Sequence, residues 1–234
     1  MQIDFIAFGA HPDDVELFAG GTMAKMAALG YSTAIVDMTR GELGTRGSVA
    51  LRRKESLKAA KILGLKERHA LGFPDGNVRV TAGALLKVIR VLRKYRPKVV
   101  LTHHWDDFHP DHLHTSRLVT EAAHHSGLAK IDTGQERFRP RALLYFKVPL
   151  HTTPGLVVDV TDYSAQRRDA ILAYGSQLFD PSSSEPETKL SHPDFLARIE
   201  SIHRFYGSLI GKKVGEAFCI NGVLEVKDLL QQFT

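Results

Sequence analysis

The stretch Ile3-Asp4-Phe5-Ile6-Ala7-Phe8-Gly9-Ala10-His11-Pro12-Asp13-Asp14 has the pattern of a buried strand that passes directly into a helix. Its first eight residues are mostly apolar, as in a strand that is covered on both faces. Proline disfavours the helical conformation in the residue before it, so His11 is predicted to stay extended at the strand tip. Asp13 and Asp14 then fall in the first helical turn, where the helix dipole favours carboxylates.

The rest of the chain repeats this alternation of strand and helix. The alternation predicts an α/β fold, a Rossmann-like, mostly parallel sheet flanked by helices, in a single domain spanning 1–234. After about residue 127 the pattern loosens into an irregular C-terminal portion, in which the polar segment 179–192 is predicted to be a loop. Strands are expected at 3–10, 33–38, 70–73, 98–102, 143–148, 156–160 and 217–220, and helices at 15–29, 51–63, 82–95, 110–126, 162–174 and 195–209.

A second histidine and aspartate motif, His109-Pro110-Asp111-His112, follows the apolar run Val99-Val100-Leu101. It too stands where a strand gives way to a helix, and the carboxyl ends of parallel strands are where open α/β sheets bind ligands. His109 and His112 are three residues apart and can share one face of the opening helical turn. The two motifs are therefore predicted to meet and to share one metal ion.

Two histidines and one aspartate would supply three protein ligands and leave room for water, which is the pattern of a catalytic zinc site. Consecutive helical residues point about 100° apart, so only one of Asp13 and Asp14 can be the ligand. The spacing leaves open which one it is. The other carboxylate could act as general base beside the water, and a free histidine could stabilise an oxyanion and protonate a leaving amine. This constellation predicts metal-assisted hydrolysis.

Composition excludes several other classes of protein. The chain has no apolar run of 18 residues and no signal-peptide pattern, and its single Cys219 favours a reducing compartment, so a cytoplasmic enzyme without membrane contact is expected. The net charge of +5 is spread along the chain without a basic stripe interleaved with aromatics, which argues against nucleic acid as a partner. A positive balance does suit an anionic small substrate.

The two motifs resemble the signature of the LmbE-like zinc N-deacetylases, which remove the acetyl group from N-acetylglucosamine conjugates. The resemblance covers nearly the whole chain. It is closest to the branch that deacetylates N-acetylglucosaminyl-malate in bacillithiol biosynthesis. Four segments carry that closer likeness, namely residues 6–11, 39–47, 206–211 and 215–218.

The resemblance implies a role for each motif residue. His11, Asp14 and His112 would bind zinc, with Fe²⁺ as another ion for the same site in the cell. Asp13 would be the general base, and His109 would stabilise the oxyanion with Asp111 orienting it. The family likeness also implies a homo-oligomer, with the hexamer as the state that the family suggests.

Substrate recognition is the less specific part of the pattern. Arg52 matches an arginine that the family turns toward substrate, although its spacing from Glu55 would equally allow an internal ion pair. The branch often has arginine directly before the second motif, where this chain has Phe108. Arg46, Arg52 or a lysine of the 179–192 loop is the expected partner of a malate carboxylate. The rival hypotheses are a deacetylase of another N-acetylglucosaminide, such as a chito-oligosaccharide, and a metal-stabilised binding module without turnover.

Overall fold

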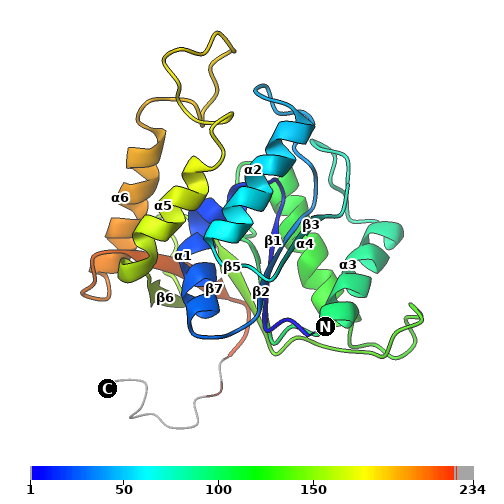
Figure 1. Cartoon of the computed structure of the whole chain (residues 1–234). Coiled ribbons are helices and arrows are strands. Elements are labelled where there is room, and N and C mark those ends of the chain that lie inside the picture. The colour runs from blue at the N-terminus through cyan, green and yellow to red at the C-terminus, as the bar shows by residue number, and fades with distance from the viewer. Residues whose placement is uncertain (1, 224, 226–234) are drawn as a thin grey trace.

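The computed structural model describes residues 2–223 and 225, and within them seven strands form one sheet in the order β3-β2-β1-β4-β5-β7-β6 (Figure 1). The strands are β1 (Phe5–Gly9), β2 (Thr33–Asp37), β3 (Glu67–Ala70), β4 (Val99–His103), β5 (Ala142–Phe146), β6 (Leu156–Asp159) and β7 (Gly215–Ile220). The helices are α1 (Asp14–Ala28), α2 (Val49–Ile62), α3 (Ala82–Tyr95), α4 (Pro110–His125), the short 3₁₀ turn η1 (Thr161–Tyr163), α5 (Ser164–Leu172) and α6 (Phe195–Ser208).

The order of the strands reverses next to β1. From β1 the chain moves outward through β2 to β3 and then returns to place β4 on the other side of β1, with all of these neighbours parallel. The carboxyl ends of β1 and β4 therefore lie side by side at a topological switch point, the usual ligand position of open α/β sheets. Both sequence motifs follow these two strands, so the fold brings them to one place.

The predicted α/β class, with a mostly parallel sheet, is confirmed. The irregular portion of the sheet is at its C-terminal edge, where β7 lies antiparallel between β5 and β6. No helix among residues 2–223 and 225 is long and apolar enough to cross a membrane.

Helices cover both faces of the sheet, as Figure 1 shows, with α3 and α4 on one side and α1, α2 and α5 on the other. Alternate residues of each central strand point to opposite faces. Ile6 and Phe8 of β1 pack in the core beneath α3 and α4, whereas Ala7 packs in the core beneath α1 and α5. Both faces of the central strands are thus buried, which accounts for the continuous apolar runs of these strands in the sequence.

The edge strand β3 differs from its prediction by three residues. The sequence predicts a strand at 70–73, whereas the ladder with β2 runs over Glu67–Ala70. The apolar residues Leu71 and Phe73 lie just beyond the ladder, donate single backbone hydrogen bonds to Asp37 and Met38, and pack against the core. Apolar burial therefore continues past the end of β3. The sequence-based prediction follows these apolar residues and so places the strand three residues too late.

Candidate metal and catalytic site

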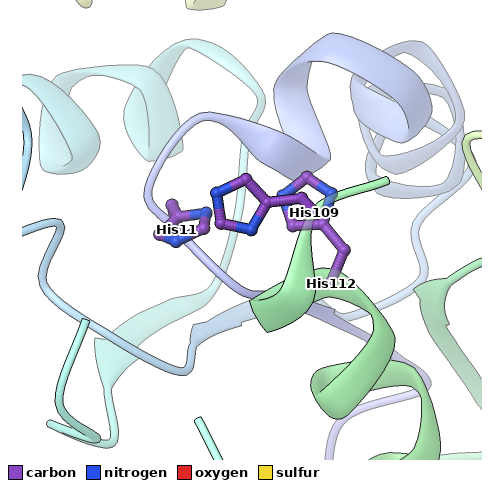
Figure 2. A group of neighbouring side chains, drawn as sticks. All are labelled: His11, His109 and His112. Carbon is purple, nitrogen blue, oxygen red and sulfur yellow. The ribbon is translucent and has the colours of Figure 1, made fainter. Parts of the chain in front are cut away.

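The site lies between the loop that joins β1 to α1 and the first turn of α4. Figure 2 shows the imidazoles of His11, His109 and His112 gathered there. The ring centroids of His11 and His109 are 4.8 Å apart, and those of His109 and His112 are 4.5 Å apart and nearly parallel. Pro110 at the start of α4 fixes the turn that places both histidines of the second motif on the same side. The predicted meeting of the two motifs is confirmed in space.

Asp14 lies at the centre of this group. Its Oδ2 is 3.4 Å from Nδ1 of His11, and its Oδ1 is 3.3 Å from Nε2 of His112. One more imidazole, that of the buried His103 at the end of β4, approaches Oδ2 to 3.2 Å and stacks on His112. Asp14 therefore contacts both histidines implied as ligands, and His103 approaches it as closely, so that Asp14, His103 and His112 also form a group able to hold a metal ion.

The ring nitrogens that face away from Asp14 are held by other carboxylates. Nε2 of His11 lies 3.1 Å from Asp75 Oδ1 and 3.3 Å from Asp111 Oδ2. Nδ1 of His112 lies 2.9 Å from Asp107 Oδ2. Carboxylates in this position orient metal-binding histidines and increase their basicity. The inward-facing atoms, Nδ1 of His11 and Nε2 of His112, are therefore the ones presented for coordination.

The charge balance of this group fits a cation. Burial disfavours the charged imidazolium of His112, but the Asp14 and Asp107 carboxylates outweigh it and raise the pKa of His112. The pKa of His11 is raised in the same way, against burial, by Asp111, Asp14 and Asp75. This donor set, with two imidazoles and a carboxylate facing one another, matches the ligands of a divalent transition metal. The carboxylates that raise these two pKa values are Asp14, Asp75, Asp107 and Asp111.

Asp13 is held in an unusual conformation beside the ligands. Its φ of 115° lies in the region that favours glycine, and its backbone carbonyl accepts the first hydrogen bond of α1. Burial raises the pKa of its carboxyl to about 7, although the Arg52 guanidinium opposes this rise from 2.6 Å. A carboxylate with a pKa near neutrality is suited to accept a proton at working pH.

His109 is oriented by the backbone of its own helix. Its Nδ1 accepts the backbone N–H of Asp111 at 3.2 Å, so in the neutral ring the proton resides on Nε2. Burial, together with the neighbouring His112 and His11, lowers the pKa of His109 and favours this neutral form. The prediction that the Asp111 carboxylate orients His109 needs correction. That carboxylate accepts hydrogen bonds from the backbone of Gly76 and Val78 and faces His11 instead.

The two predicted substrate arginines are buried and already have partners. Arg52 donates from Nη2 to Asp13 and to the Pro12 carbonyl, and from Nη1 to Gln177. It is not paired with Glu55, whose carboxylate instead accepts hydrogen bonds from the backbone and hydroxyl of Ser176. The structure thus places Arg52 against the candidate base.

Arg46 lies in the glycine-rich loop before α2 and is 6% exposed. Its Nε lies 3.6 Å from Glu185 Oε2, and its carbonyl accepts a hydrogen bond from the Gln177 amide. Both arginines are therefore joined to the chain that follows α5, through Gln177 and Glu185.

The sequence pattern assigns no role to three further groups at the site. Asp75 falls in a predicted turn, yet that turn follows β3 at the same edge of the sheet as the two motifs, and this position is the available signal. Lys147, at φ 59° directly after β5, lies 2.6 Å from Asp107 and 2.9 Å from His112 Nδ1. Gln177 has no local signal, because its contact with Arg52 spans 125 positions.

Comparison with known proteins matches this site to one family. Residues 6–123, which include both motifs, match the family described as PIG-L: GlcNAc-PI de-N-acetylase. The chain is 29% identical to a diacetylchitobiose deacetylase of Thermococcus kodakarensis over 88% of this chain and 78% of that protein. It is 28% identical to a probable N-acetyl-alpha-D-glucosaminyl L-malate deacetylase 2 of Bacillus anthracis, over 71% of this chain and 78% of that protein.

A solved structure matches the fold over nearly its whole length. It is that of a conserved protein of Thermus thermophilus, which is 36% identical, with a TM-score of 0.87, over 97% of this chain and 98% of that chain. The likeness therefore extends through the C-terminal portion that carries Gln177 and Glu185.

Proposed function

This chain belongs to the PIG-L family of GlcNAc-PI de-N-acetylases, and on that premise we propose that it is a zinc-dependent deacetylase of an N-acetylglucosamine conjugate. The observation that carries this proposal is the position of Asp14 between His11 Nδ1 and His112 Nε2, with the buried Asp13 carboxylate next to it. This arrangement supplies three ligands and a separate base, as hydrolysis of an amide requires.

Each residue has a task in the proposed reaction. Zn²⁺ bound by His11, Asp14 and His112 would supply Lewis acidity, which polarises a carbonyl and makes water nucleophilic near neutral pH. Asp13 accepts a proton from the attacking water as the new carbon–oxygen bond forms. His109 donates from Nε2–H to the carbonyl oxygen as negative charge develops on it. The carbon–nitrogen bond then breaks, the leaving amine takes up the proton that Asp13 accepted from water, and acetate is released.

We propose N-acetylglucosaminyl-malate as the substrate, which would place the enzyme in bacillithiol biosynthesis. The similarity to the probable malate-conjugate deacetylase and the net charge of +5 support an anionic conjugate. The similarity to a diacetylchitobiose deacetylase supports a second candidate, a chito-oligosaccharide.

An acetate-release assay tests the activity and separates these candidates. Purified protein would be given N-acetylglucosaminyl-malate, N,N′-diacetylchitobiose and free N-acetylglucosamine, each with and without a chelator. We expect acetate from the malate conjugate, loss of activity with chelator, and recovery on adding Zn²⁺. Activity that resists the chelator would contradict the metal mechanism. Bound conjugate without any acetate would favour the binding-module hypothesis.

Three further properties belong to the proposal and have direct measurements. Elemental analysis of protein purified without added metal would identify Zn²⁺ or Fe²⁺ in the site. Sedimentation analysis would test the homo-oligomer, for which six subunits is the expected number. The single cysteine, Cys219, is buried and free, which suits the proposed cytoplasmic location.

A further inference from the structure

Phe108 is the most exposed aromatic side chain among the residues that the structure describes, at 72%. It directly precedes His109, so its ring lies at the edge of the candidate active site. The ammonium groups of two lysines lie near this ring. Nζ of Lys147 lies 4.7 Å from the ring centroid and Nζ of Lys189 lies 4.3 Å from it, both within the range of a cation–π contact.

The two lysines differ in how their charge is compensated. Nζ of Lys147 forms an ion pair with Asp107 at 2.6 Å, and its side chain is largely buried. Lys189 is exposed, and no carboxylate of the described residues lies within ion-pair distance of its ammonium group. Phe108 therefore holds at the edge of the site a positive charge that the described part of the protein does not neutralise.

The backbone around Lys189 is fixed, although it belongs to the predicted loop 179–192. The Thr188 N–H donates to Ser191 Oγ at 2.8 Å, and the Ser191 N–H donates to Thr188 Oγ1 at 3.2 Å, which closes a tight turn around Lys189. Leu190 packs against the apolar cluster between α1, α5 and α6. These contacts make Lys189 a positioned cation.

The same loop is attached to the opposite side of the site. Glu185 accepts the Gly47 N–H at 2.9 Å and lies near Arg46, so the loop joins the glycine-rich segment before α2. Residues 185–189 therefore connect the segment before α2 to Phe108, which lies two residues before α4. Lys147 contacts both the Phe108 ring and Nδ1 of His112, so the ring that carries Lys189 lies beside a proposed metal ligand.

We propose that Lys189, oriented by the ring of Phe108, binds a carboxylate on the aglycone of the substrate and so selects anionic N-acetylglucosaminides over neutral ones. This proposal rests on the deacetylase function proposed above and names the residue that recognises its anionic aglycone. Lys189 contributes through its charge, and Phe108 is a positioning residue that keeps the ammonium group at the edge of the site.

The ratio of kcat/KM for N-acetylglucosaminyl-malate to kcat/KM for the neutral N,N′-diacetylchitobiose tests the proposal. We expect Lys189→Gln to lower this ratio about tenfold, mainly through a higher KM for the malate conjugate, because a charge-assisted contact is lost. Phe108→Ala should lower the ratio in the same direction, and Phe108→Tyr, which keeps an aromatic ring, should retain it. Lys130→Gln, an exposed lysine beyond the far end of α4, is the matched control and should leave the ratio unchanged.

The possible results separate this proposal from the one on which it rests. Acetate release from both substrates with the same ratio in wild type and Lys189→Gln would overturn the role of Lys189 and leave the deacetylase function intact. A wild-type preference for the neutral substrate would also overturn it. If neither substrate releases acetate, the proposed function itself is wrong.

Discussion

Asp13 and Arg52 form a buried pair whose chemistry depends on the hydrogen bond between their side chains. Family likeness implies that Arg52 contacts substrate, whereas the structure ties two of its nitrogens to Asp13, Pro12 and Gln177. These two roles predict different kinetics. A substrate contact acts mainly on KM, whereas a cation beside the general base acts on the ionisation of that base.

We therefore expect Arg52→Gln to change the pH profile of kcat/KM. The guanidinium stabilises ionised Asp13, so its removal raises the pKa of the proposed base and should shift the acidic limb of the profile to higher pH. At neutral pH the loss should be at least about tenfold, as for impaired general-base catalysis. If the acidic limb does not shift and only KM rises, Arg52 binds substrate and does not control the ionisation of Asp13.

Asp75 contacts the predicted ligand His11, and its substitution tests whether this contact strengthens metal binding. Because it holds Nε2 of His11 from 3.1 Å, Asp75→Asn should weaken metal binding by about tenfold without removing a ligand. Titration with Zn²⁺ against a competing chelator would measure the change. Asp132→Asn, in an exposed loop, is the control. Equal affinity in Asp75→Asn and wild type would show that Asp111 alone is sufficient to orient His11.

Among the elements, β1 and β4 are also tied at the end of the sheet that lies opposite the site. Asp4, directly before β1, accepts hydrogen bonds from Lys98 and from Ser32, which precede β4 and β2. The bond from Lys98, followed by those from Ser32, lowers the pKa of Asp4 to about 2.

This pKa shift predicts a pH-dependent contribution to stability. A carboxyl whose pKa is lower in the folded state stabilises the fold above its unfolded pKa of about 3.9, and the stabilisation is lost as the pH falls toward 2. Asp4→Asn should therefore lower the free energy of unfolding by on the order of 1 kcal/mol at pH 7 and by less at pH 3. Urea denaturation at the two pH values measures this. A difference in the free energy of unfolding between Asp4→Asn and wild type that is larger at pH 3 than at pH 7 would contradict this prediction.

The sequence predicts most elements within a few residues because buried strands and capped helices have local signals. Ser48 and Thr81 cap α2 and α3 through their side chains, as such residues do at helix starts. The edge strand β3 is the exception, since its residues are polar and half-exposed while the apolar residues follow it.

The predicted metal and catalytic residues follow the ends of β1 and β4, whereas the predicted substrate residues Arg46 and Arg52 lie in the loop before α2 and in α2. The meeting of the motifs that contain His11 and His112 could be predicted because strand ends at a switch point must lie together, whereas the choice of Asp14 over Asp13 as ligand comes from the family resemblance alone. The orientation of Asp111 could not, since it depends on backbone donors at Gly76 and Val78 in another turn. Gln177 could not be found either, because only the folded chain brings it from after α5 to Arg52. Lys189 differs, since it is the one lysine of the 179–192 loop, from which the sequence predicts a partner for a carboxylate.

In the molecule as a whole, the proposed metal site joins the segments after two strands, about a hundred residues apart. A metal that binds only the folded protein should therefore raise its melting temperature. At a free concentration of 100 Kd the stabilisation is about 2.7 kcal/mol, or roughly 5–10 °C for a chain of this size. Calorimetry with and without Zn²⁺ measures this shift. His112→Ala, which lacks one ligand, should show a much smaller shift, and a full shift in that variant would place the metal elsewhere.

The backbone conformation of Asp13 lowers the stability of the fold, although the aspartate itself has a proposed role in catalysis. At φ 115° glycine would be accommodated more easily than aspartate, and strained positions of this kind cost of order 1–3 kcal/mol. An engineering campaign that selected variants only for resistance to heat would favour glycine at position 13, and it would enrich for proteins that lack the proposed general base. Any stabilised version of this chain should therefore be screened for turnover from the first round.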